Sequence, residues 1–129
     1  MEKKINPDNI ELFTRQIVKL AIDLPQDKIG ANAQKEILTS STRATTAIKL
    51  ALLEKPGKQV YDQLNLVLEN LSSVKFWLDF LAAEEYLSAE SYNSFKQAAN
   101  ENILQTHAWR SEHEKLLALS YPGEWFLVD

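Results

Sequence analysis

One series of apolar residues between positions 58 and 87 repeats at alternating spacings of four and three. Its members are Val60, Leu64, Val67, Leu71, Val74, Leu78 and Leu81. Because a helix turns once every 3.6 residues, only a long helix places all of these side chains on one side. The spacing also matches the a and d positions of a heptad, by which helices pack in bundles. The pattern therefore predicts a core helix over about 58–87.

Capping residues and prolines predict the limits of three further helices. Asn6-Pro7-Asp8 favours a helix start, and Leu24-Pro25 ends that helix because a residue before proline avoids the α region. Pro56-Gly57 closes the second helix, and Ser88 is a good N-cap for the fourth. We therefore expect an all-α fold, an antiparallel up-down-up-down four-helix bundle in a single domain over residues 1–129, with helices at about 7–24, 27–55, 58–87 and 88–119 and a C-terminal tail at 120–129.

The second and fourth helices carry inward-facing rows of different character. The row on 27–55 is dominated by small residues, namely Ile37, Ser41, Ala44, Ile48 and Ala51. The hydroxyl side chains between positions 39 and 46 are expected to bond back to carbonyls one turn earlier, although contact with a partner or with phosphates is an alternative. The predicted row on 88–119 consists of Tyr92, Phe95, Ala99, Ile103, Thr106, Trp109 and Leu116.

The middle of the 58–87 helix is apolar on nearly every side. A second row runs beside the buried one and consists of Leu66, Asn70, Ser73, Trp77 and Phe80. A helix buried on one face does not need this row, so Phe76, Trp77 and Phe80 are predicted to form an interface between subunits. The alternative is a wide core covered by the tail. The apolar Trp125–Val128 segment of that tail could pack on its own bundle or on a partner.

The composition is typical of a globular protein, with 45% hydrophobic and 25% charged residues. The absence of cysteine excludes disulfides and thiolate metal sites. No apolar run approaches the roughly 20 residues that cross a bilayer, and no hydrophobic stretch follows the first residues as in a signal peptide. These features predict a cytoplasmic protein.

Motifs for catalysis and cofactor binding are absent from the sequence. His107 and His113 lack the Glu-x-x-His pairing of di-iron bundles, and their spacing of six turns them to different helix faces. The chain has three glycines and none of them forms a phosphate-binding loop, and no serine lies in a Gly-x-Ser-x-Gly elbow. We therefore expect a non-enzymatic protein with no metal ion and no cofactor.

The net charge of −4 is unevenly distributed along the chain. Residues 1–58 carry ten Lys and Arg against seven Asp and Glu, whereas residues 59–129 carry four against eleven. This polarity suits an anion-binding face or head-to-tail contacts between copies, although chance scatter is an alternative. A cationic stripe suited to phosphates is predicted along the second helix and just beyond it, and a solvated face is the alternative. It consists of Lys28, Lys35, Arg43, Lys49, Lys55 and Lys58.

Two stretches resemble a known family. They are Arg43-Ala-Thr-Thr-Ala-Ile48, continuing to Glu54 and Pro56-Gly57, and Lys75-Phe-Trp-Leu-Asp-Phe-Leu-Ala82. They are similar to the bacterial four-helix bundle proteins encoded in intervening sequences of ribosomal RNA genes. The same superfamily includes Avd, the accessory variability determinant of diversity-generating retroelements. Ala47, Ala51 and Ser73 depart from the intervening-sequence pattern and favour the Avd-like branch.

The resemblance implies a homo-oligomer, in Avd-like proteins a pentameric barrel, that works with a reverse transcriptase and binds RNA or single-stranded DNA through basic surface. It leads to the hypothesis of an Avd-like accessory, with the cationic stripe on phosphate and the aromatic residues between subunits. The acidic net charge favours an alternative, a scaffold or adaptor of the same family that binds only protein. A third alternative is the folded product of a selfish insertion.

Overall fold

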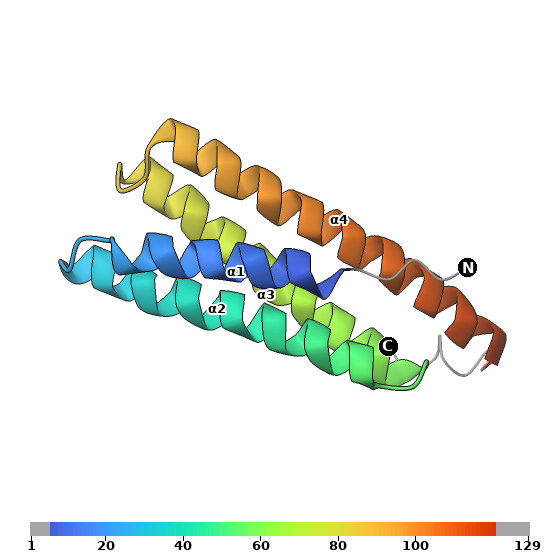
Figure 1. The fold of residues 1–129 in the computed structure, drawn as a ribbon. Coiled ribbons are helices and arrows are strands. Elements are labelled where there is room, and N and C mark those ends of the chain that lie inside the picture. Colours follow the sequence, from blue (N-terminus) through green and yellow to red (C-terminus); the bar gives the residue numbers. More distant parts are fainter. Residues whose placement is uncertain (1–5, 121–129) are drawn as a thin grey trace.

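The computed structural model describes residues 6–120, which form four helices. They are α1 (Pro7–Ile22), α2 (Lys28–Leu53), α3 (Lys58–Ala83) and α4 (Ala89–Ser120). Successive helices run in opposite directions and are joined by short turns, as Figure 1 shows. The predicted all-α, antiparallel four-helix bundle is confirmed. The Trp125–Val128 segment lies outside the described residues.

Side chains cap the starts of α1, α2 and α4, and those at α1 and α4 are the caps that the sequence predicts. The Asn6 side chain accepts a hydrogen bond from the Asp8 amide at 2.9 Å, and Pro7 occupies the first helical position. The Ser88 hydroxyl oxygen accepts from the Ser91 amide at 3.1 Å. Asp27 caps α2 by accepting from the Gly30 amide at 2.7 Å. These contacts satisfy amide groups that have no partner within their own helix.

Three helices end earlier than predicted. α1 ends at Ile22 because the amides of Asp23 and Leu24 close a tight final turn before Pro25. α2 ends at Leu53, since the following residue is already extended. α3 ends at Ala83, where Glu85 adopts a φ of +62° and the Tyr86 amide donates to the Leu81 carbonyl at 2.8 Å. A left-handed residue followed by such a backward bond is a common helix end.

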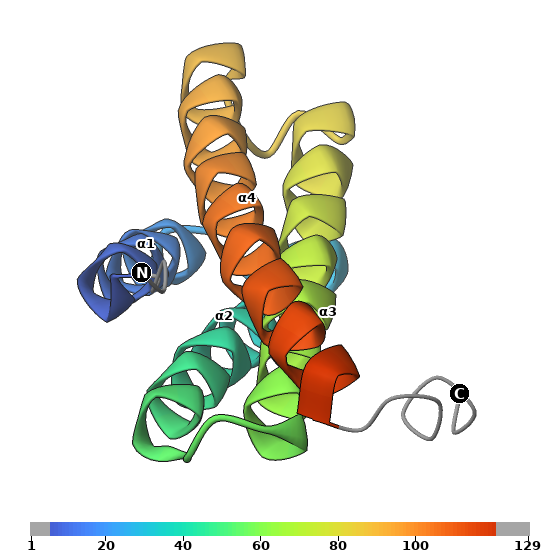
Figure 2. The same cartoon turned by 90° about the vertical axis from the view of Figure 1, so that its right-hand side faces the viewer.

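The core forms between the rows of side chains predicted on α2, α3 and α4, and one residue of the α4 row was predicted wrongly. Every member of the α3 row is buried, and so are Ile37, Ser41, Ala44, Ile48 and Ala51 of α2. On α4 the prediction for Leu116 is wrong, because its side chain is exposed whereas His113 and Leu117 are buried. Each step of four residues turns the buried row by about 40° around a helix. This drift follows the oblique course of α4 across the bundle (Figure 2).

Hydroxyl groups of α2 bond within the helix and to its neighbours. Those of Thr39, Thr42 and Thr46 donate to carbonyls four residues earlier, which confirms the structural interpretation of this polar stretch. Ser40 donates to Ser73 of α3 at 2.9 Å. α1 and α4 touch each other least among the adjacent helix pairs. None of the helices described has the length and apolarity needed to cross a membrane.

Candidate functional site: the groove between α2 and α3

An aromatic cluster on α3 extends from the edge of its buried row, where Trp77 packs against the core, to its exposed side, where Phe76 lies. The ring of Trp77 packs edge-on against Phe76 at a centroid distance of 5.3 Å and against Phe80 at 5.5 Å. Phe76 is 59% exposed, while Trp77 and Phe80 are half-buried. Leu78 and Leu81 point to the core, so the helix is apolar on two faces. The predicted second apolar face of α3 is therefore present.

Trp77 and Phe80 of this cluster form one wall of a hollow between α2 and α3. This hollow has a volume of about 380 Å³ and is lined by Lys28, Ile29, Asn32, Trp77 and Phe80. Three of the lining side chains are apolar or aromatic, and the one charged group is the Lys28 ammonium. Such a hollow suits an apolar side chain with a carboxylate or another anion close to it.

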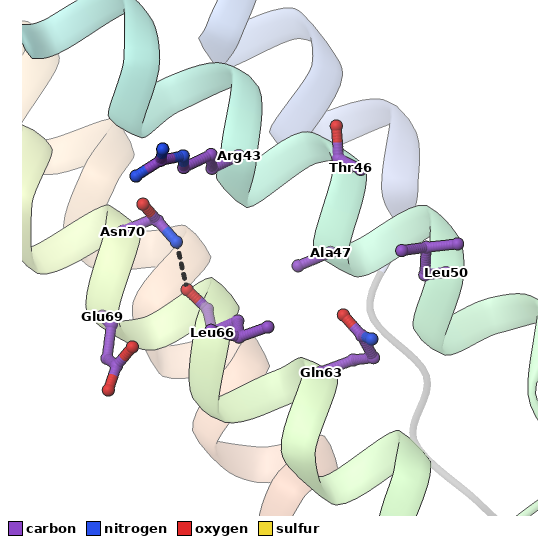
Figure 3. Close-up of a pocket in the computed structure, with 8 residues that line it drawn as sticks. All are labelled: Arg43, Thr46, Ala47, Leu50, Gln63, Leu66, Glu69 and Asn70. Atoms are coloured by element: carbon purple, nitrogen blue, oxygen red, sulfur yellow. Dashed lines mark hydrogen bonds between the residues drawn. The ribbon is translucent and has the colours of Figure 1, made fainter.

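A second hollow of about 520 Å³ lies further along the same two helices (Figure 3). It is more polar, and its lining residues are Arg43, Thr46, Ala47, Leu50, Gln63, Leu66, Glu69 and Asn70. Figure 3 shows the guanidinium end of Arg43 close to the side chain of Asn70, whose amide donates to the Leu66 carbonyl at 2.8 Å. Leu50 of α2 and Leu66 of α3 both line the hollow and are partly exposed. In Figure 3, Leu50 lies opposite Gln63, and Leu66 lies opposite Ala47.

The two hollows belong to one surface. Their α2 residues recur at spacings of three, four and seven, so they lie on one side of that helix. Between the hollows, the Ser40–Ser73 hydrogen bond joins the two helices. We call this surface the α2–α3 groove, with an aromatic end at Lys28, Trp77 and Phe80 and an arginine end at Arg43 and Leu66.

The six predicted phosphate-binding residues are all exposed, but they do not form one continuous stripe. Lys49 turns toward α1, where its ammonium lies 3.0 Å from a carboxylate oxygen of Glu11. Lys58 pairs with Asp62 at 3.2 Å. The hydrogen bond from Lys49, together with its charge, lowers the pKa of Glu11. Among residues 6–120 the remaining four, Lys28, Lys35, Arg43 and Lys55, have no ion-pair partner.

Two predicted surfaces thus converge on the α2–α3 groove. The sequence places most of the phosphate-binding residues on the second helix and the subunit contacts on the third, and in the fold Lys28 lines the same hollow as Trp77 and Phe80. Ile29 and Asn32 were not among the predicted site residues. Their spacing of three on the first turns of α2 was the available signal, but only the pairing of α2 with α3 shows which residues they face.

A third, polar hollow of about 320 Å³ lies where α1 meets α4. It is lined by Asn9, Leu12, Phe13, Gln16, Ser94, Ala98, Glu101, Asn102 and Gln105. The side-chain amide nitrogen of Asn102 donates to the Ala98 carbonyl at 2.9 Å, while its oxygen is buried and has no partner among the described residues. A direct contact between the two helices here is the 3.5 Å bond from Asn9 to Gln105.

The two histidines occupy different environments and are not close to a set of metal-binding side chains. His107 is exposed, and His113 is buried against Trp109 at a ring centroid distance of 5.8 Å. Within the described part of the chain, no group of three or more His, Asp or Glu side chains is arranged to hold a metal ion.

The comparison with solved structures supports the helical-bundle fold. Among solved structures, the chain is similar to a protein of unknown function from the S23 ribosomal protein family of Bacteroides thetaiotaomicron. The superposition has a TM-score of 0.76 and 24% sequence identity, and covers 81% of this chain and 94% of the other. At this identity the likeness shows a shared fold. No protein-family profile matches the chain. No curated protein matches it either.

Proposed function

We propose that this protein is a non-enzymatic scaffold that assembles with copies of itself through the α2–α3 groove. The observation that carries the proposal is the cluster of Phe76, Trp77 and Phe80, partly exposed on a helix whose buried row already fills the core. Ile29, Leu50 and Leu66 extend the apolar surface along the groove. Contiguous apolar surface with a polar rim marks protein interaction sites.

The proposed role of the assembly is that of an Avd-like accessory in a diversity-generating retroelement, holding a reverse transcriptase and its RNA or cDNA in the cytoplasm. Two features support this role. The motifs around Arg43 and Lys75 resemble that family. Four of the six basic residues also have no ion pair among the described residues.

A second candidate function is a scaffold or adaptor that binds only protein. The pairing of Lys49 and Lys58 with carboxylates favours it, because paired cations attract phosphate less. The net charge of −4 favours it as well. Protein purified at low salt should carry nucleic acid if it is the Avd-like accessory and none if it binds only protein. The ratio of its absorbance at 260 and 280 nm distinguishes the two outcomes.

Self-association is tested by a charge placed within the aromatic cluster. Phe76→Glu should lower the mass measured by sedimentation velocity, because a carboxylate cannot be buried between subunits without a partner. Leu104→Glu is the matched control, since Leu104 is 69% exposed on α4, away from the groove. If both variants and the unmodified chain sediment equally, the groove is not the surface through which copies of the chain assemble. Circular dichroism would establish that both variants are folded.

A further inference from the structure

We propose that the aromatic end of the α2–α3 groove binds the segment 124–129 of a second copy of this chain. The inference deepens the proposed self-association, on which it rests, by naming what occupies the groove. It makes the contact heterologous, because the groove of one copy receives a different part of the next. Such contacts form rings when the rotation between copies closes.

The groove defines the chemistry of its occupant. Trp77 and Phe80 of α3 and Ile29 of α2 supply apolar walls, and the hollow of about 380 Å³ has room for a large apolar side chain. Lys28 at its rim has no ion-pair partner among residues 6–120, and Lys35 follows one heptad later. An apolar segment flanked by carboxylates would satisfy both the walls and the rim.

The sequence of this chain contains such a segment. Residues 124–129 read Glu-Trp-Phe-Leu-Val-Asp, in which four successive apolar residues stand between two carboxylates. Aromatic and aliphatic side chains of this kind are the usual anchors of a protein interface. The charge of the segment is opposite to that of Lys28 and Lys35, so the two surfaces are complementary in polarity and in sign.

The length of the chain shows that a Trp125 bound in this hollow must come from another copy. α4 ends beyond the start of α3 (Figure 1), whereas Trp77 and Phe80 lie close to Ala83, the last residue of α3. The rise of α3 from Lys58 to Trp77 alone is about 28 Å. Trp125 follows Ser120 by five residues, which span at most about 18 Å when fully extended. The chain's own tryptophan therefore cannot reach this hollow.

The absence of cysteine from the sequence makes a cross-linking test direct. Asn32→Cys places a thiol at the rim of the hollow, and Val128→Cys places one in the segment. A mixture of the two full-length variants should form a disulfide-linked dimer under mild oxidation, identified by mass spectrometry as an Asn32→Cys to Val128→Cys link. Leu104→Cys in place of Asn32→Cys is the control. A yield no higher than this control would overturn the proposal. So would a disulfide within one chain, observed in a variant that carries both Asn32→Cys and Val128→Cys.

Charge exchange gives a second readout without cysteine. Lys28→Glu should weaken assembly about tenfold, and adding Glu124→Lys with Asp129→Lys to the same chain should restore it. Trp125→Ser should weaken assembly while Leu104→Ser does not. If the unmodified chain assembles and Trp125→Ser assembles equally well, the segment is not the occupant although self-association stands. If the unmodified chain does not assemble at all, the proposed function fails first.

Discussion

The ammonium group of Lys49 lies 3.0 Å from the Glu11 carboxylate, which joins the exposed surface of α2 to α1. Both side chains are partly exposed, so the pair contributes little to stability. Its consequence for binding is larger. A lysine already paired with a carboxylate releases fewer counterions when it meets a phosphate, so the six predicted phosphate-binding residues are not equivalent.

Nucleic-acid binding, if it follows the proposed function, should therefore depend on Lys35 and Arg43 more than on Lys49. Charge reversal at Lys35 and Arg43 is expected to abolish retention of a short single-stranded RNA. Reversal at Lys49 alone should change the slope of log affinity against log salt by less than about one unit. Fluorescence anisotropy over a salt series measures both effects. An equal loss on reversing Lys49 would mean that Glu11 does not neutralise it.

Stability should vary with pH through the contact between Tyr86 and Asp27, whose oxygens lie 2.5 Å apart. The hydrogen bond from Tyr86, aided by the Gly30 amide, lowers the pKa of Asp27 below its ordinary value of 3.8. The stabilisation that this carboxylate provides is therefore present above pH 3.8 and is lost as pH falls through the lowered pKa. The same hydrogen bond raises the pKa of Tyr86 above its ordinary value of 10.0. The stabilisation that the protonated Tyr86 hydroxyl provides is therefore lost as pH rises through this raised pKa.

Tyr86→Phe removes this contact and should lower the Tm. The difference in Tm from the unmodified chain should be widest between about pH 5 and pH 9 and should narrow on either side. Thermal unfolding followed by circular dichroism across this range provides the measurement. A difference that stays constant at every pH would show that the lost hydroxyl acts through packing and not through Asp27.

The buried row of α3 should dominate stability. Leu71 is fully buried in the middle of this helix, so Leu71→Ala is expected to reduce the free energy of unfolding by about 2–5 kcal/mol. Leu104→Ala on the exposed side of α4 should change it by less than about 0.5 kcal/mol. Urea unfolding of both variants compares them directly. Similar losses from the two substitutions would contradict the assignment of the core.

Gly30 should not tolerate a side chain, although it lies within a helix. A Cβ atom at this position would lie 1.8 Å from the Pro25 carbonyl oxygen, and a backbone atom cannot move aside as a flexible side chain can. Ala is usually about 1 kcal/mol better than Gly in a helix. Here we expect Gly30→Ala to destabilise the protein by about 1–3 kcal/mol. If urea unfolding shows that Gly30→Ala is more stable than the unmodified chain, the Pro25 carbonyl does not approach α2 this closely.

Local chemistry made much of the fold predictable. The heptad spacing of Leu64, Leu71 and Leu78 identifies a long helix with one buried side, and the structure buries all three. The caps at Asn6 and Ser88 depend on a hydrogen bond within three residues, so the sequence contains all of the information they need. The predicted helix ends were less accurate. The end of α3 depends on a left-handed backbone conformation at Glu85, and a glycine, the usual sequence signal for this conformation, is absent there.

Contacts between helices could not be predicted in the same way. The partner of Lys49 lies 38 positions earlier, and nothing near Lys49 in the sequence indicates it. The groove itself depends on which residues of α2 face Trp77 and Phe80, so Ile29 and Asn32 became site residues only in the folded chain. The shift from Leu116 to Leu117 follows the inclination of α4, a property of the whole bundle.

The central claim is that the α2–α3 groove joins copies of this chain, and the mass of the unmodified protein tests it most directly. Light scattering coupled to size exclusion should give a multiple of the 14.7 kDa chain mass. The value should move toward a single copy on dilution, and short RNA added to the same sample shows whether the assembly also binds nucleic acid. A mass of 14.7 kDa at every concentration would contradict the account.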